Sequence, residues 1–301
     1  PEQSGPESPT PDSPTPEPDT PTYTYGDTTT HPYLAIDDNG AIYCTDNTVT
    51  EVEIPDYFND IKVDSIKDGA FSECEVLQSI TIPGTVTSIG NDVFNGCDKL
   101  ASITFEPSPT GEALTIGWNT DGTDEGLFVD CPLQTVNLNR QLSYAIASED
   151  LDEDVVPFAG KSLGNGVTLG EQVHTLLPYM FSTSGITSLK IPATVEEIKD
   201  NAFYECTTLA SVRFEAGTEP LTIGFQPGSS EVGPFYQSPL TNIYVNRELV
   251  ASESYADKRD QNDEGIFSTS FDDAVVTVTL GENVKTISDY MFTGVKMESL
   301  T

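Results

Sequence analysis

The sequence predicts a fold of short stacked coils, each contributing one strand to a parallel β-sheet. Short runs that alternate polar and β-branched apolar residues recur along the chain, as in SITI at residues 79–82, and this alternation is typical of half-buried strands. From Ile80 onward, the middle apolar residues of these runs follow at steps of 23, 33, 31 and 22 residues, then 23, 31, 35 and 22. A recurring pattern of steps indicates stacked structural units.

A phenylalanine precedes nearly every run by 8 to 11 residues. In a stacked array the chain returns to the same side once per coil, so equivalent residues of neighbouring coils lie on top of one another. We therefore expect these rings to form a continuous column in the core rather than an aromatic binding site. The column comprises Phe71, Phe94, Phe128, Phe158, Phe181, Phe203, Phe235, Phe267 and Phe292.

Two long sections of the chain resemble each other, residues 100–142 and residues 209–249, which indicates duplication of a four-coil block. Their long coils carry insertions between strand and phenylalanine, and most are acidic, such as NTDGTDEG at 119–126. Clustered acidic and amide oxygens can bind Ca²⁺. The insertions do not reproduce the spacing of an EF-hand, however, and solvated loops are the favoured interpretation.

Composition divides the chain into three parts. Residues 1–32 are rich in proline and acids, which favours a disordered linker or stalk. Residues 33–50 read as two short strands around a DDNG turn, and we expect them to form an N-terminal cap hairpin. Residues 51–301 form the repeat domain of about ten coils, and its C-terminal end is expected to be open or truncated because no sealing unit follows MESLT.

Charge and hydropathy exclude several functions. The chain has 13 Lys and Arg against 49 Asp and Glu, a net charge of −36, which disfavours binding to nucleic acid or anionic membranes. No apolar run approaches the roughly 18 residues that span a bilayer, so membrane insertion is not expected. The chain begins at Pro1 without a signal-like segment; a signal or lipid anchor would lie upstream.

The five cysteines do not indicate a disulfide framework, because their number is odd. Four of them follow a phenylalanine by three residues, a placement typical of small buried apolar side chains. With no histidine beside them and no CxxC spacing, we interpret them as structural thiols rather than as catalytic or metal-binding groups. They are Cys44, Cys74, Cys97, Cys131 and Cys206.

Two segments, LQSITIPGTVTSIGNDVFNGCDKLASITF at 77–105 and ITSLKIPATVEEIKDNAFYECTTLASVRF at 186–214, resemble the BspA-like (Treponema pallidum-type) leucine-rich repeats of bacterial surface proteins, common in Bacteroides-type organisms. The resemblance covers about residues 50–301. It implies a right-handed α/β solenoid, a leucine-rich repeat array with little regular helix. It also implies an exported, often lipid-anchored protein that attaches to host proteins or to other cells.

No catalytic motif is present. His31 lies at the linker boundary and His174 occupies an outward position that accepts any residue type in other coils. The sequence contains no HExxH, P-loop or GxGxxG pattern and no recognisable Ser/His/Asp set. We therefore expect no enzyme activity, no cofactor and no metal.

The outward strand positions are the better candidate for function. Most carry small neutral residues, but three consecutive coils present Lys190, Arg213 and Tyr244, which parallel strands would place about 5 Å apart step by step. Two cations beside a tyrosine could bind an acidic peptide or a sulfated or sialylated glycan, although exposed strand positions also accept these residues freely. The small residues at the other positions are Ser79, Thr81, Ser102, Thr104, Thr135, Asn137, Thr168, Thr277 and Thr279.

Two functions are consistent with this arrangement. The first is a non-catalytic cell-surface or secreted adhesion module that recognises host proteins or glycans through the strand face. The second is a structural spacer or a self-associating surface scaffold. Binding of the folded domain to a ligand array would favour the first, and self-association the second.

Overall fold

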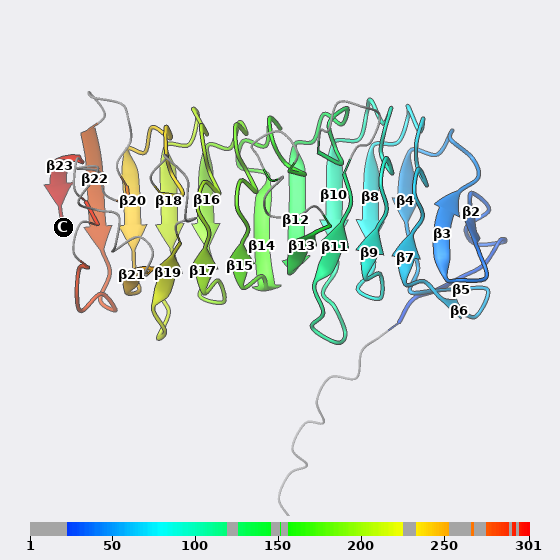
Figure 1. Cartoon of the computed structure of the whole chain (residues 1–301), viewed down its shortest axis with the longest axis horizontal. Coiled ribbons are helices and arrows are strands. Elements are labelled where there is room, and N and C mark those ends of the chain that lie inside the picture. Colours follow the sequence, from blue (N-terminus) through cyan, green and yellow to red (C-terminus); the bar gives the residue numbers. More distant parts are fainter. Residues whose placement is uncertain are drawn as a thin grey trace, which may run out of the picture.

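The computed structural model describes most of the chain, namely residues 23–118, 126–145, 151, 156–224, 233–252, 266–267, 275–288, 291–292 and 295–301. Figure 1 shows the strands following one another along a single long axis from the hairpin of β2 and β3 to β23. The described residues form parallel sheets of successive coils, as the sequence predicts.

The outward strands form two five-stranded parallel sheets whose order follows the sequence. Within the first, Ile80 pairs in register with Ile103, and Ile103 with Val136, so the middle apolar residues align as predicted. Thr187 N donates a hydrogen bond to Gly164 O at 2.8 Å and joins the two sheets. The strands of the first sheet are β4 (Glu51–Glu53), β8 (Ser79–Ile82), β10 (Ser102–Phe105), β12 (Thr135–Arg140) and β14 (Val167–Gln172), and those of the second are β16 (Ser188–Ile191), β18 (Ser211–Phe214), β20 (Asn242–Val245), β22 (Val275–Leu280) and β23 (Lys296–Leu300).

The prediction of one strand per coil is wrong, because most coils contribute a second, shorter strand to another parallel face. These second strands are only two or three residues long, too short to show alternation in the sequence. Their apolar residues, such as Ile89 and Ile198, still point inward and are buried. The strands are β7 (Ser65–Ile66), β9 (Ser88–Ile89), β11 (Leu114–Ile116) and β13 (Leu142–Tyr144), then β15 (Thr175–Leu176), β17 (Glu197–Ile198), β19 (Leu221–Ile223) and β21 (Leu249–Ala251).

The described residues contain no helix, so the α/β class predicted from the family resemblance needs correction. The segment before each outward strand is instead a series of tight turns. In the first coil, Cys74 N donates to Phe71 O and Leu77 N to Cys74 O, both three residues back. Non-glycine residues within these turns adopt positive φ, including Glu73 at 61° and Glu205 at 51°, a conformation that interrupts a right-handed helix.

The N-terminal hairpin consists of β2 (Leu34–Ile36) and β3 (Ala41–Cys44), which pair antiparallel. Strand β3 also pairs in parallel with β7, so the hairpin extends the shorter-strand face at one end of the stack. It lies within residues 33–50, where the sequence predicts a cap. That capping role stays a prediction.

Residues 23–32, assigned to the linker by composition, contact the first coil. Strand β1 (Tyr25–Gly26) pairs in parallel with β5 (Tyr57–Phe58), which also pairs antiparallel with β6 (Ile61–Lys62). Thr24 N donates to Asp56 Oδ2 at 2.8 Å, and the ring of Tyr25 stacks on Tyr57 at 5.1 Å between centroids. The contacts of residues 23–32 with the first coil thus lie on the linker side of the boundary predicted from composition, and they are made by tyrosines that interrupt the proline-rich sequence.

The phenylalanine column is confirmed. Consecutive rings from Phe71 to Phe292 stack at centroid distances between 5.0 and 5.9 Å, with interplanar angles between 2° and 24°. Four cysteines beside the column, Cys74, Cys97, Cys131 and Cys206, are free and buried, as predicted for structural thiols. Each coil thus contributes one ring and often one thiol to a single core.

We predict that Phe203→Ala lowers the free energy of unfolding by about 3–5 kcal/mol, because it leaves a cavity in the column. Phe203 is fully buried between Phe181 and Phe235, whose ring centroids lie 5.6 and 5.1 Å away. Chemical unfolding followed by circular dichroism measures the change. Thr81→Ala, on the partly exposed outward face, serves as the control and should change stability by no more than about 0.5 kcal/mol. An unchanged midpoint for Phe203→Ala would contradict the column.

Candidate functional site

Lys190, Arg213 and Tyr244 lie in one row on three adjacent strands. Lys190 of β16 is paired in register with Arg213 of β18, and Arg213 with Tyr244 of β20. All three occupy outward positions, since the residues before and after them on each strand are buried. We refer to these three residues as the basic patch.

Arg213 and Tyr244 form a cation–π contact. The guanidinium carbon of Arg213 lies 3.8 Å from the centroid of the Tyr244 ring, within the range in which a cation is attracted by the ring face. The side chain of Lys190 is 74% exposed and that of Arg213 is 45% exposed. The stacked guanidinium is therefore held in place while remaining accessible to solvent.

Glu215, which was not among the predicted site residues, completes the group. Its Oε1 lies 2.9 Å from Arg213 Nε and 3.2 Å from Lys190 Nζ. Burial raises the pKa of Glu215, but the hydrogen bonds and charges of Arg213 and Lys190 outweigh it and leave the pKa below its ordinary value. The hydrogen bond to Glu215 likewise raises the pKa of Arg213. The signal was present in the sequence, because Glu215 follows Arg213 by two residues and strand side chains alternate with that period.

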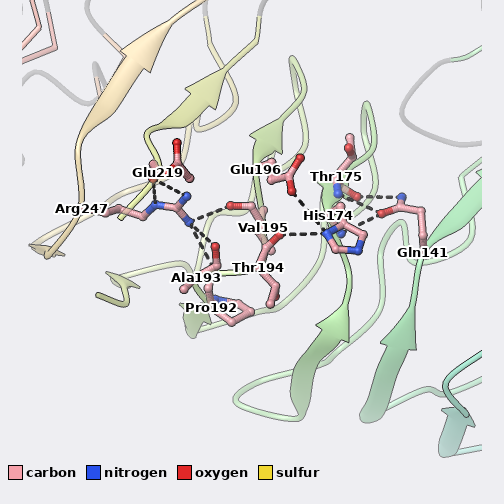
Figure 2. A network of polar contacts seen from close by, with 10 residues as sticks. All are labelled: Gln141, His174, Thr175, Pro192, Ala193, Thr194, Val195, Glu196, Glu219 and Arg247. Carbon is pink, nitrogen blue, oxygen red and sulfur yellow. Dashed lines mark hydrogen bonds and ion pairs between the residues drawn. The ribbon is translucent and has the colours of Figure 1, made fainter. Parts of the chain in front are cut away.

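Arg247 holds together the coils that carry the patch (Figure 2). It is fully buried and follows β20, the strand of Tyr244. Its guanidinium donates to Val195 O at 2.7 Å, Ala193 O at 3.0 Å and Glu219 O at 2.8 Å. Residues 193 and 195 closely follow β16. The Arg247 side chain therefore connects the C-terminal end of β16, which carries Lys190, to the C-terminal end of β20, which carries Tyr244. It does so across β18, which lies between these two strands.

Arg140 makes the same contacts in the first block. It is fully buried, and its guanidinium donates to Val86 O at 2.7 Å, Gly84 O at 3.2 Å and Glu112 O at 2.9 Å. Burial lowers the pKa of Arg140 to about 10, so the group still carries its charge at neutral pH. The matching segments NLNRQL and YVNREL carry this signal in the sequence, although their similarity alone indicates duplication rather than a buried contact.

Comparison with known families identifies the repeat. The sequence model of the BspA type leucine-rich repeat region matches in six copies over residues 39–111, 64–149 and 157–260, more than half of the chain. The chain belongs to the BspA-type leucine-rich repeat family. Comparison with curated proteins finds no match.

Two solved structures resemble this BspA-type chain. One is a leucine-rich cell surface protein from Faecalibacterium prausnitzii, 17% identical with a TM-score of 0.34, where the alignment covers 88% of this chain and 93% of that chain. The other is a leucine-rich repeat protein from Bacteroides ovatus, 17% identical with a TM-score of 0.30, covering 89% of this chain and 75% of that chain.

The two histidines of the BspA-type chain lie far apart in the sequence and contact different polar groups. His174 is exposed, and its Nδ1 lies 3.2 Å from Thr194 O and 3.7 Å from Glu196 Oε1 (Figure 2). Nδ1 of His31 lies 2.9 Å from Thr30 Oγ1. Within the described ranges, no group of three or more His, Cys, Asp or Glu residues could hold a metal ion. The same residues include no helix long and apolar enough to cross a membrane.

The acidic insertions considered as calcium sites lie mostly outside the described residues, at 119–125, 148–150, 152–154 and 257–265. We predict that millimolar Ca²⁺ leaves the thermal unfolding midpoint unchanged, because the sequences of the insertions lack the ligand spacing of an EF-hand. A ligand that binds only the native state must stabilise it. A rise of the midpoint in Ca²⁺ that EDTA reverses would contradict this prediction, and Mg²⁺ at the same concentration is the control for ionic strength.

We predict that Arg247→Met lowers the free energy of unfolding by about 1–3 kcal/mol, because the buried carbonyl of Val195 and the partly buried carbonyls of Ala193 and Glu219 lose their donor. Arg213→Met serves as the matched control, since it removes the same side chain from a solvent-exposed position and should change stability by no more than about 0.5 kcal/mol. Urea unfolding of both variants gives the comparison. Equal stability of the two variants would contradict the role of Arg247 in joining the coils.

Proposed function

We propose that this BspA-type chain is a non-catalytic binding module, exported to the cell surface or secreted, that binds a protein or glycan ligand through the outward face of its long sheets. An extracytoplasmic location and a lipid anchor upstream of residue 1 belong to the same proposal. The outward face offers a row of hydroxyl and amide groups that continues over many coils, and Asn137 Nδ2 donates to Thr104 Oγ1 at 3.1 Å within it. Such a surface makes many modest contacts with an extended ligand.

The basic patch is the observation that carries the proposal. In a chain of net charge −36, Lys190 and Arg213 stand side by side on the outward face, and Arg213 is stacked on Tyr244. A stacked guanidinium is pre-organised, so less side-chain entropy is lost when it binds a ligand. Arg and Tyr are also enriched among the residues that dominate binding energy at interfaces. The patch therefore fits a ligand that carries carboxylate or sulfate groups.

Glu215 determines how such a ligand binds. Its carboxylate already accepts from Arg213 Nε and contacts Lys190. The solvent-accessible part of the Arg213 guanidinium can contact the ligand, and a carboxylate or sulfate that contacts Lys190 comes close to the negative charge of Glu215. Glu215 thus limits affinity for anions while it positions both cations. Neutralising it would remove this repulsion and leave two cations on the face.

We predict that Lys190→Ser combined with Arg213→Ser lowers affinity for an acidic ligand at least tenfold, whereas Glu215→Gln raises it. The folded domain is first applied to an array of acidic peptides and of sulfated and sialylated glycans, and affinities for the strongest ligand are then measured by surface plasmon resonance. Charged pairs at the centre of an interface contribute more than rim charges.

Lys62→Ser combined with Lys99→Ser removes the same charge from two exposed positions outside the patch and is the matched control. It should leave affinity within about twofold, since distant surface charges act mainly through screened long-range attraction. Undiminished affinity of the Lys190/Arg213 variant, or an equal loss in the control, would remove the patch from the proposal.

The alternative function, a self-associating surface scaffold, is supported by the exposed apolar side chains of β23. Met297 is 42% exposed and Leu300 is 52% exposed, and exposed apolar side chains can associate with another chain. Light scattering over a range of protein concentrations distinguishes the two functions. A mass that grows with concentration, without any ligand on the array, would favour the scaffold.

A further inference from the structure

The buried thiols beside the phenylalanine column follow a common hydrogen-bonding pattern. The thiol of Cys97 donates to Phe71 O at 3.2 Å, that of Cys131 to Phe94 O at 3.7 Å, and that of Cys206 to Phe181 O at 2.9 Å. In each case the acceptor is the column phenylalanine of a preceding coil. Cys74 occupies the equivalent position in the first coil of the column, where no preceding column phenylalanine exists.

Cys44 lies beside Cys74 at this position. It is the last residue of β3 in the N-terminal hairpin, its thiol donates to Asp46 O at 3.3 Å, and the Cys74 thiol is the group that lowers its pKa most. The backbone holds the pair from both sides: Cys44 N donates to Ala70 O at 2.9 Å, and β3 pairs with β7 in parallel. Two cysteines about 30 positions apart in the sequence are thus brought together where the hairpin meets the first coil.

We propose that Cys44 and Cys74 form a disulfide bond that joins the N-terminal hairpin covalently to the first coil. The other three cysteines remain thiols, because each is buried and donates to the carbonyl group of a column phenylalanine in a preceding coil. Closing a loop of this length restricts the unfolded chain and stabilises the end of the stack. The inference does not depend on the proposed ligand, although an extracytoplasmic location would supply the oxidising conditions.

The oxidant is an exchangeable disulfide, either a small molecule or an oxidoreductase. The Cys44 thiolate attacks one sulfur of this disulfide, forms a mixed disulfide and expels the first thiolate. Cys74 then loses its proton to solvent and attacks Sγ of Cys44, expelling the second thiolate. Two protein thiols are oxidised and one external disulfide is reduced to two thiols, so electrons and protons balance.

The exposure and the pKa of the two thiols explain why Cys44 reacts first with the external disulfide and Cys74 second. Cys44 is partly exposed, whereas Cys74 is 1% exposed, so the external disulfide reaches Cys44 first. The neighbouring Cys74 thiol lowers the pKa of Cys44 to about 7, and Cys44 together with burial raises the pKa of Cys74. Burial raises the pKa of Cys97 to about 12 and keeps that thiol protonated. Only Cys44 therefore combines access with thiolate character, which is the reactive form.

The test counts thiols in the full chain. One sample is incubated with oxidised glutathione and another with dithiothreitol, and both are denatured, alkylated with iodoacetamide and weighed intact by mass spectrometry. We expect five alkylated cysteines in the reduced sample, but only Cys97, Cys131 and Cys206 in the oxidised sample, with one cross-linked peptide joining Cys44 to Cys74.

Two variants complete the test. Cys74→Ala should leave Cys44 as a mixed disulfide with glutathione, because the resolving thiol is gone. Cys206→Ala should still form the Cys44–Cys74 bond and is the control for loss of a buried thiol. Five alkylated cysteines after oxidation, a glutathione adduct on Cys44 of the unmodified chain, or a bond from Cys44 to any cysteine other than Cys74 would each overturn the proposal.

Discussion

The stacking of one phenylalanine ring per coil is the constraint on which the rest of the structure depends. Ring centroids lie 5.0–5.9 Å apart along the column, close to the spacing of about 4.8 Å between hydrogen-bonded strands. Core packing and backbone pairing therefore impose one common rise per coil. Steps as different as 22 and 35 residues yield equivalent strands because each coil is anchored by its ring. Because every coil has the same rise, Lys190, Arg213 and Tyr244 lie in register on neighbouring strands.

The two buried arginines meet a second requirement. Without helices in the described ranges, the carbonyl groups that follow the outward strands need donors from elsewhere, and a buried carbonyl without a partner is costly. A guanidinium offers five N–H donors in a fixed plane. Arg140 and Arg247 use this geometry at equivalent points of the duplicated blocks, and the charges of Glu112 near Arg140 and of Glu196 and Glu219 near Arg247 oppose the effect of burial on their pKa. The patch thus rests on coils joined both by the sheet and by Arg247.

The sequence predicted those features of the fold that repeat with a regular period. It did not predict features that depend on a contact made by one residue. The column, the outward strands and the row of three patch residues follow from a period of two along the strand and one ring per coil. The second strands were missed because two residues show no alternation, and the helix expectation failed because residues such as Glu73 adopt positive φ. The burial of Arg140 was not predicted, because a charged residue in a sequence is normally expected to be exposed to solvent. Cys44 and Cys74 meet only through the pairing of β3 with β7.

The direction of the backbone pairing has a mechanical consequence. Hydrogen bonds between successive parallel strands point along the axis of the stack, so tension applied between its two ends loads one strand interface after another rather than all of them together. Strands pulled in this direction unzip at modest force, coil by coil, from whichever end is weaker. Because Arg247 and Arg140 each span two interfaces, they would resist separation at these points and divide the extension of the chain into discrete steps.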